Sequence, residues 1–247
     1  MRSGPSTSVR EVRLPVAAAL LVVLASAAAT AAYALSRPAP EPPPLAELPA
    51  VPAAPEPEPI RPKLEPPTPE PIRWRRSLAV GSHAAGRLVR GVRLPPERPE
   101  FFTWDPVKRR SPNRPWRRFG TGRVIRVLLE VAREHRAAHP RAPRMAIGDI
   151  SRPRGGDFGP QFGYIGHASH QNGLDVDVYY PRADGRERAP RDATQIDRRL
   201  SQELVTRFLA RGAEVIFVGP NTGLRGPPGR VQALVNHDNH LHVRFPL

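Results

Sequence analysis

Cysteine is absent from the 247 residues of the chain. Disulfides are therefore excluded, and no thiol can serve as a nucleophile or as a metal ligand. Lysine is almost absent too, since it occurs only at Lys63 and Lys108 while arginine supplies the rest of the positive charge. The net charge of +15 favours an anionic polymer or phospholipid headgroups as partners, although a biased codon composition would also produce it. No nucleic-acid reading motif is present, so we expect no nucleic-acid partner.

Charged residues are missing from residues 14–35, an apolar and alanine-rich run. A helix of roughly 20 such residues is long enough to cross a bilayer. The preceding residues 1–13 carry three arginines, which predicts a cytoplasmic basic tail under the positive-inside rule. Small residues near the end of the run would also suit a signal-peptidase cut. The run exceeds a usual signal core, so a retained transmembrane anchor is favoured over a cleaved signal, and the remainder is expected to be exported.

Residues 36–72 have too few large apolar side chains to build a core, and they hold about half of the chain's 33 prolines. This composition predicts a disordered, extended linker of polyproline character. The linker would act either as a stalk that carries a domain away from the membrane or as a passive connection. The folded domain is accordingly expected over residues 73–247, a length that supports one ordinary core.

Hydrophobic periodicity predicts an α+β domain in which a small antiparallel sheet is flanked by two main helices. The helices are expected over residues 122–140 and 195–212. His135 and His139 lie at the polar end of the first helix, where we expect both to be solvated. Residues 100–121 are expected to form a loop with exposed aromatic side chains. Strands are expected at 76–95 (two short strands around a glycine turn), 144–151, 174–180, 213–219 and 240–245.

Histidine is scarce, and five of the 8 histidines fall in two short segments, "HASHQNGLDVDVYY" and "NHDNHLHVRF". Successive side chains of a strand point to opposite faces. Asp175 and Asp177 therefore share one face of the first predicted strand, opposite its apolar side chains. His240 and His242 share a face of the second in the same way. If the strands are neighbours, Asp177, His240 and His242 converge, and the Asn-Gly turn could fold His170 back over them.

Two imidazoles and one carboxylate with an open fourth position are typical of a catalytic zinc site. A structural zinc site would normally use four protein ligands, usually with cysteine. A hydrogen-bonded surface network is the plain alternative, and the placement of these residues opposite apolar faces disfavours it. Ser169 is a weak nucleophile candidate, because adjacent residues rarely pair as nucleophile and base and no GxSxG elbow is present. The glycine-rich residues 152–166 lack the Lys-Ser/Thr of a phosphate loop.

These two motifs, with "GDISRPRGG" and "GSHAAGRLVRGVRLP", resemble the penicillin-insensitive murein endopeptidases. That family is grouped with lysostaphin-type peptidases, zinc D-alanyl-D-alanine carboxypeptidases and the hedgehog signalling domain. The resemblance covers about residues 78–247. It implies one zinc ion held by His170, Asp177 and His242, with His240 as catalytic base or stabiliser of the transition state. It also implies that His167 and His237 line the site, where a second metal is not excluded.

Two acidic residues complete the expected site. Asp175 shares the face of Asp177 but lies nearer the glycine turn, so we expect it to orient a ligand histidine. Asp238 is expected to hydrogen-bond substrate or water together with His237. The chain departs from the family in having no disulfide and in the basic loop at residues 106–118, which leaves the details of substrate binding open.

The expected function is that of a zinc-dependent murein endopeptidase acting on peptidoglycan cross-links, with the D-alanyl–diaminopimelyl bond as the target. The alternatives are a zinc D-alanyl-D-alanine carboxypeptidase and a non-catalytic zinc or cell-wall-binding module. Peptidoglycan and, through the N-terminal segment, the cytoplasmic membrane are the expected partners; no protein partner is predicted. The location would be periplasmic or on the cell-wall side.

We predict that the mature protein remains in the membrane fraction, because the apolar run at residues 14–35 exceeds a signal core. Fractionation followed by N-terminal sequencing checks this. A soluble protein whose sequence begins near Tyr33 or Ser36 would show that the segment is a cleaved signal.

Overall fold

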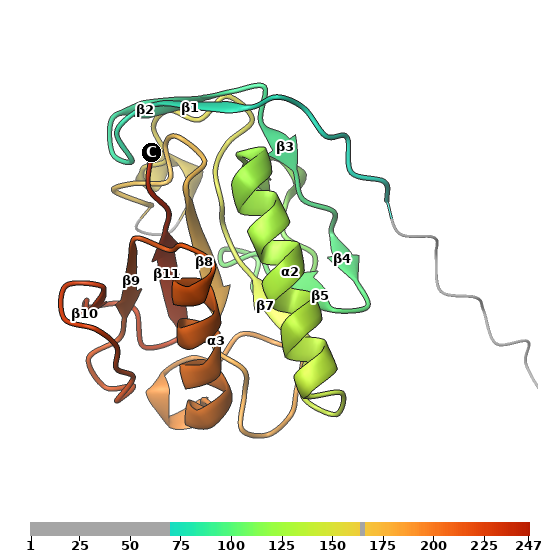
Figure 1. Ribbon diagram of the computed structural model, residues 1–247, viewed down its shortest axis with the longest axis vertical. Helices are drawn as coiled ribbons and strands as arrows, with labels where there is room; N and C mark the ends of the chain where they lie inside the picture. The colour runs from blue at the N-terminus through green and yellow to red at the C-terminus, as the bar shows by residue number, and fades with distance from the viewer. Residues whose placement is uncertain (1–69, 164–165) are drawn as a thin grey trace, which may run out of the picture. The chain divides into compact units, whose positions relative to one another are not determined.

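The computed structural model describes residues 70–163 and 166–247 (Figure 1). The expected tail and anchor, and all but the last residues of the expected linker, lie outside these residues. Among the helices described, none combines the length and the apolar character that crossing a bilayer would require.

Across the described residues, a mixed sheet has the strand order β10-β9-β11-β8-β7-β5-β4. The pairs β10–β9 and β5–β7 are parallel, and the other neighbours are antiparallel. The sheet was expected to be small and antiparallel, whereas it is a mixed sheet of seven strands; the expected α+β class agrees with the structure. The strands are β4 (Glu97–Arg98), β5 (Phe101–Thr103), β7 (Met145–Ile147), β8 (Asp175–Tyr179), β9 (Val215–Val218), β10 (Val231–Ala233) and β11 (His240–Arg244).

Two α-helices in the described part of the chain lie on one side of this sheet, α2 (Gly122–Ala138) and α3 (Arg198–Ala210) (Figure 1). Both begin at a capping side chain that accepts a hydrogen bond from a backbone N–H in the first turn. Thr121 caps α2 through the N–H of Val124, and Asp197 caps α3 through the N–H of Leu200. The predicted helices are confirmed to within a few residues at each end.

The apolar side chains of the helices and of the central strands form one core on the helix side of the sheet. Val176 and Val178 of β8 and Leu241 and Val243 of β11 are fully buried in this core. Since side chains alternate along a strand, the residues between them must project from the opposite face. The helix partners in the core include Leu128, Val131, Leu204, Val205 and Phe208.

A hairpin of β1 (Leu78–Gly81) and β2 (Gly86–Val89) confirms the two short strands predicted around a glycine turn. Beside it, β3 (Val92–Arg93) pairs with β6 (Phe119–Gly120). The hairpin contacts the glycine-rich loop, where Arg87 forms an isolated bridge with Gly155. Short 3-10 helices occur at Pro115–Arg117, Pro160–Phe162 and Ala193–Gln195.

Two local expectations are wrong. Residues 100–121 do not form a loop with exposed aromatics, because Phe101 and Phe102 are buried in β5. His135 is not solvated but 1% exposed, with Nε2 lying 3.2 Å from the carbonyl of Pro143. Burial lowers its pKa. The chain after α2 folds back over this histidine, which helical periodicity alone does not reveal.

We predict that Phe208→Ala lowers the free energy of unfolding by about 3–5 kcal/mol, because it removes a fully buried ring from the core. Leu78→Ala is the control, since Leu78 is 58% exposed and its truncation should change stability by about 0.5 kcal/mol or less. Urea unfolding followed by circular dichroism measures both. Equal losses in the two variants would contradict the packing of Phe208 in this core.

Candidate metal centre

The two histidine-rich segments meet because β8 and β11 are antiparallel neighbours. His242 stands directly opposite Asp177, and Arg244 stands opposite Asp175. These side chains occupy the face of the sheet turned away from the helices, since their neighbours in each strand are in the core. The predicted juxtaposition of the two strands is thus confirmed.

The carboxylate of Asp177 lies at the centre of four imidazoles. Its Oδ1 is 3.3 Å from Nε2 of His170, 3.7 Å from Nδ1 of His242 and 3.7 Å from Nε2 of His240. Its Oδ2 is 3.8 Å from Nδ1 of His167. Asp177 is buried, whereas the side chains of His167 and His240 remain 20% and 16% exposed. The cluster is therefore closed underneath and accessible from one side.

A tight turn folds His170 back over β8, as the Asn-Gly pair predicted. His170 has a φ of 67°, and Gly173 in the same turn has a φ of 76°. The N–H of His170 donates to Oδ2 of Asp175 at 3.0 Å. Its ring atom Nδ1 lies 2.7 Å from the carbonyl of Ile150. A carbonyl only accepts hydrogen bonds, so Nδ1 carries a proton and the neutral ring would leave Nε2 as a lone-pair donor toward Asp177.

Asp175 of β8 contacts side chains of β11 on the buried side of the cluster. It is fully buried, and its Oδ1 accepts a hydrogen bond from Nε of Arg244 at 2.9 Å. The same oxygen lies 3.2 Å from Nε2 of His242, close enough for a charge interaction but without the alignment of a hydrogen bond. A proton on Nε2 would leave Nδ1 of His242 facing Asp177. This arrangement places Asp175 where a residue that orients the ligand histidines must lie.

Three buried polar atoms of the cluster have no hydrogen-bond partner among the described residues: Nε2 of His170, Oδ1 of Asp177 and Nε2 of His242. Unpaired buried polar atoms are rare in proteins and call for an explanation, such as a missing ion. A metal ion between His170 and Asp177 would satisfy the first two. The donor set of imidazole and carboxylate is the one that zinc accepts.

Distances within the cluster bring one further histidine into consideration. Ligand atoms of His167, His170 and Asp177 all lie within 4.8 Å of one another. In a tetrahedral zinc site with bonds of about 2.0–2.2 Å, neighbouring ligand atoms stand roughly 3.5 Å apart. His242 also reaches Asp177 but lies outside this tightest group. His167 was expected to line the site or to bind a second metal, and it lies in this tightest group with His170 and Asp177.

The family model described as penicillin-insensitive murein endopeptidase matches residues 79–213. The chain belongs to this family. The resemblance inferred from the sequence motifs is thereby confirmed. The matched range includes His167, His170, Asp175 and Asp177 and ends before β11.

Curated relatives carry the same family name. A penicillin-insensitive murein endopeptidase of Haemophilus influenzae is 27% identical over 196 residues, which are 69% of this chain and 64% of that protein. Penicillin-insensitive murein endopeptidases of Yersinia enterocolitica and Salmonella paratyphi C are each 31% identical over 101 residues, or 41% of this chain and 32% of the relative. The chain thus spans less than two thirds of each relative that it matches.

Charges in the centre of this family member are strongly coupled. Burial alone would lower the pKa of His170, but the carboxylates of Asp177 and Asp175 outweigh it and raise the pKa to about 9. The histidines in turn hold the pKa of Asp177 well below its ordinary value despite burial. Burial lowers the pKa of His240 to about 3 and also lowers that of His242. Both of these rings are therefore neutral at pH 7, with a lone pair to offer.

Asp149 is a polar residue at the site that the sequence reasoning did not assign. It is fully buried, and its Oδ2 lies 2.8 Å from Nε2 of His167 and contacts the guanidinium of Arg117. Its Oδ1 accepts a hydrogen bond from Nδ2 of Asn113 at 2.9 Å. The available signal was an acidic residue directly after the short strand "MAIG", within a motif that resembles the family.

His237 and Asp238 take different positions. The ring of His237 lies 4.6 Å from that of His240, measured between centroids, so it borders the cluster. Asp238 instead accepts hydrogen bonds from the backbone and side-chain nitrogens of Asn221, at 3.0 and 2.6 Å. Its carboxylate ties the loop after β9 to the start of β11.

We predict that the purified chain binds about one equivalent of zinc, and that His170→Ala and Asp177→Ala each remove most of it. Metal analysis by mass spectrometry checks this. The nearby carboxylates raise the pKa of His170 to about 9, and zinc must displace the proton that the ring therefore holds, so zinc affinity should increase with pH up to about 9. His139→Ala is the control, because His139 contacts Glu203 outside the cluster. Unchanged zinc in both site variants would disprove the ligand assignment.

Proposed function

We propose that this chain is a zinc-dependent murein endopeptidase that hydrolyses peptide cross-links in peptidoglycan. Family membership supports the substrate class. The observation that carries the metal dependence is the pair of unpartnered buried atoms, Nε2 of His170 and Oδ1 of Asp177. Zinc held there would lower the pKa of a bound water toward 7 and polarise a carbonyl.

His170, Asp177 and His242 are our proposed ligands, with the fourth position left for water and substrate. His240 would act on a water held at the centre. Its Nδ1 lies 2.6 Å from Oδ1 of Asn239, and this contact favours a proton on Nδ1 and a lone pair on Nε2. Nε2 points toward Asp177, so it can accept a hydrogen bond or a proton from water at the centre. The low pKa of His240 keeps the ring in the accepting form at neutral pH.

Cleavage within a cross-link, rather than removal of a terminal residue, is favoured by the two arginines that contact the carboxylates of the centre. An enzyme that trims a terminal residue needs a cation or backbone donors for the free carboxylate. Arg244 is hydrogen-bonded to Asp175, and Arg117 is buried against Asp149. The buried guanidinium of Arg117 is therefore not available to a substrate terminus, and Arg244 already donates its Nε–H to Asp175. The proposed bond is the D-alanyl–diaminopimelyl cross-link, cleaved on the periplasmic or cell-wall side of the cytoplasmic membrane.

Chromatography of muropeptides tests this proposal. The chain is incubated with cross-linked peptide dimers and, separately, with pentapeptide monomers. Conversion of dimers to monomers that persists with β-lactam and stops with chelator supports it. Release of D-alanine from pentapeptides with dimers intact would identify a carboxypeptidase instead. Zinc binding without either reaction would identify a non-catalytic wall-binding module.

We predict that His240→Ala keeps its zinc but lowers dimer cleavage by about 10²–10⁴-fold, the usual effect of removing a general base. Zinc content and cleavage rate are measured on the same preparation. A variant that loses its zinc would show that His240 is itself a ligand.

A further inference from the structure

We propose that Asp149 is a positioning residue that presents Nδ1 of His167 to the metal centre, and that Arg117 and Asn113 hold Asp149 in place. This inference rests on the metal site of the proposed function. It adds a role for three side chains that sequence reasoning left unassigned.

The environment of Asp149 shows a carboxylate held from two directions. Asn113 donates Nδ2–H to its Oδ1 at 2.9 Å, and the guanidinium of Arg117 reaches its Oδ2. Asp149 is fully buried and Arg117 is 1% exposed. A buried charge pair is costly unless its geometry and remaining hydrogen bonds are satisfied. Here the guanidinium also donates to the carbonyl of Phe162 and packs against the ring of Trp116, with its carbon 4.7 Å from the ring centroid, while its Nε has no hydrogen-bond partner among the described residues.

The contact between Asp149 and His167 determines what His167 offers to the centre. An ionised carboxylate only accepts hydrogen bonds, so at 2.8 Å from Oδ2 of Asp149 the atom Nε2 of His167 must carry a proton. A neutral ring then has its lone pair on Nδ1, which lies 3.8 Å from Oδ2 of Asp177. In the opposite tautomer an N–H would point into the metal centre, and no lone pair of His167 would be available there to an ion or to a water.

The backbone of His167 is fixed as well. Its N–H donates to the carbonyl of Phe158 at 2.8 Å, and the two residues form an isolated bridge. Its ring lies 4.2 Å from that of His170 and 4.9 Å from that of Phe158, between centroids. Because the backbone N–H and Nε2 of His167 are both held by hydrogen-bond partners, the ring is oriented so that its Nδ1 faces Asp177.

Asp149→Asn tests the role, and Asp105→Asn is the matched control. Asp105 is likewise fully buried and paired with an arginine, Arg114, but contacts no histidine. Nitrogen NMR of the metal-free full chain reports the ring tautomer of His167, assigned with His167→Gln. Competition with a coloured chelator reports zinc affinity. We expect the Nε2–H form in the parent chain, its loss in Asp149→Asn, and about 10–100-fold weaker zinc binding there.

The control should lose stability without changing either readout. The inference fails if the metal-free parent chain shows His167 protonated on Nδ1 alone, a result that requires no folded variant. It also fails if both variants destabilise the protein equally while tautomer and zinc affinity stay unchanged. Neither the tautomer of His167 nor the zinc affinity requires murein cleavage. A failure of the proposed activity can therefore be distinguished from a failure of this inference.

A different observation carries a second proposal. We infer that a hairpin arginine surface, made of Arg75, Arg76, Arg87, Arg90 and Arg154, binds the anionic murein network. This inference deepens the proposed function by assigning a surface that retains the polymer outside the metal centre.

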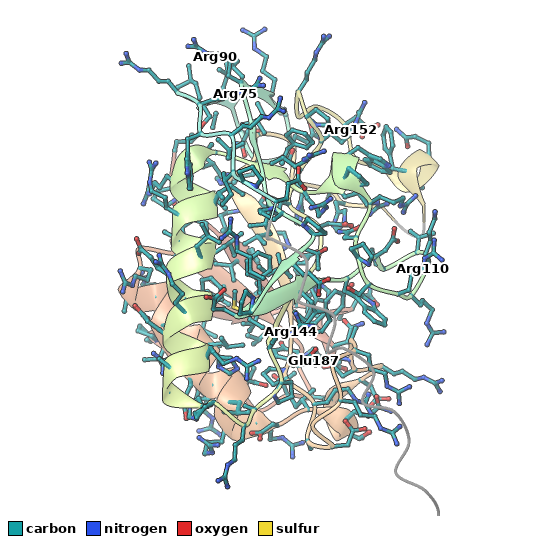
Figure 2. All side chains as sticks on the ribbon, turned by 90° about the vertical axis from the view of Figure 1, so that its right-hand side faces the viewer. Arg75, Arg90, Arg110, Arg144, Arg152 and Glu187 are labelled. Carbon is teal, nitrogen blue, oxygen red and sulfur yellow. The ribbon has the colours of Figure 1, made fainter. Side chains whose placement is uncertain are left out.

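The side chains of the hairpin arginine surface are exposed, and within residues 70–163 and 166–247 none forms a side-chain hydrogen bond or ion pair. Strand pairing brings them together: Arg87 forms a bridge with Gly155, and Leu88 donates to the carbonyl of Arg154 at 2.9 Å. Figure 2 shows Arg75 and Arg90 at one end of the domain, pointing away from it.

Several arginines elsewhere on the domain are paired with acidic residues, which those of the hairpin arginine surface are not among the described residues. Arg144 bonds Glu187, and the two lie side by side in Figure 2. Arg211 likewise contacts Glu130 and Glu134 across the two helices. Grouping like charges with no counterion among the described residues is unfavourable for the compact state, yet it suits a polyanionic ligand.

The position of the surface favours murein over a lipid headgroup. The loop that carries Arg154 continues to Gly156, whose N–H donates to the carbonyl of Gln171 at 2.8 Å, directly beside His170. A long substrate at the centre can therefore extend over the surface. Murein peptides carry carboxylates, which arginine binds through two parallel hydrogen bonds.

The test compares the triple variant Arg87→Glu, Arg90→Glu, Arg154→Glu with a control that reverses Arg141, Arg188 and Arg191, which are also exposed. Co-sedimentation measures binding to insoluble murein sacculi, and soluble peptide dimers measure the centre itself. We expect sacculus binding to weaken at least about tenfold in the first variant only, with dimer cleavage within about twofold. Binding by the parent chain should fall as salt increases.

Equal losses of sacculus binding in both triple variants would show that binding depends on net positive charge and not on this surface. That result would overturn the inference. Binding to phosphatidylglycerol vesicles without binding to sacculi would replace murein with a membrane surface. If the parent chain cleaves no dimers but still binds sacculi through this surface, the proposed activity fails while the surface assignment stands.

Discussion

The centre depends on one register, the pairing of β8 with β11 that sets His242 opposite Asp177. Because side chains alternate, this register sends Val176, Val178, Leu241 and Val243 into the core and the polar residues to the other face. A shift of one residue would expose four buried side chains and scatter the cluster. Burial of the apolar face thus stabilises the geometry of the polar face.

Placing carboxylates and imidazoles on a buried face is costly, and the surrounding structure offsets the cost unequally. Asp175 and Asp149 each have an arginine, and Asp175 also accepts a backbone N–H from His170. Asp177 has no such support; its Oδ1 lacks a hydrogen bond among the described residues. Under the proposed roles the two supported carboxylates would orient the histidines that they contact, and the unsupported one faces the space between them. The hydrogen bonds that offset the burial of each carboxylate are therefore the same contacts that distinguish the proposed role of Asp177 from those of Asp175 and Asp149.

Local sequence patterns predicted part of the fold and of the centre, whereas features that arise from tertiary contact could not be predicted. Alternation identified the faces of β8 and β11, and the Asn-Gly pair indicated the turn at His170. The strands β5 and β10 have three residues each, too few for a periodic signal, and both add to the sheet by parallel pairing. His135 was expected to be solvated. Its burial could not be predicted from the helix pattern, because it depends on residues beyond the end of α2. Asp149 acquires a role only through Arg117 and His167, both distant in sequence.

The order in which strands leave the ribosome differs from their order in the sheet. β11 is the last strand of the described chain, yet it lies between β8 and β9, two strands synthesised before it. Until residue 244 has been delivered, β8 and β9 present open edges and the cluster lacks two of its imidazoles. The pairing that closes the sheet must then bring together β8 and β11, which lie about 60 residues apart in the sequence. Such a non-local step slows folding. The sheet is consequently assembled and the centre completed in one event. A nascent chain has neither a complete sheet nor a complete centre until β11 has been synthesised and has paired.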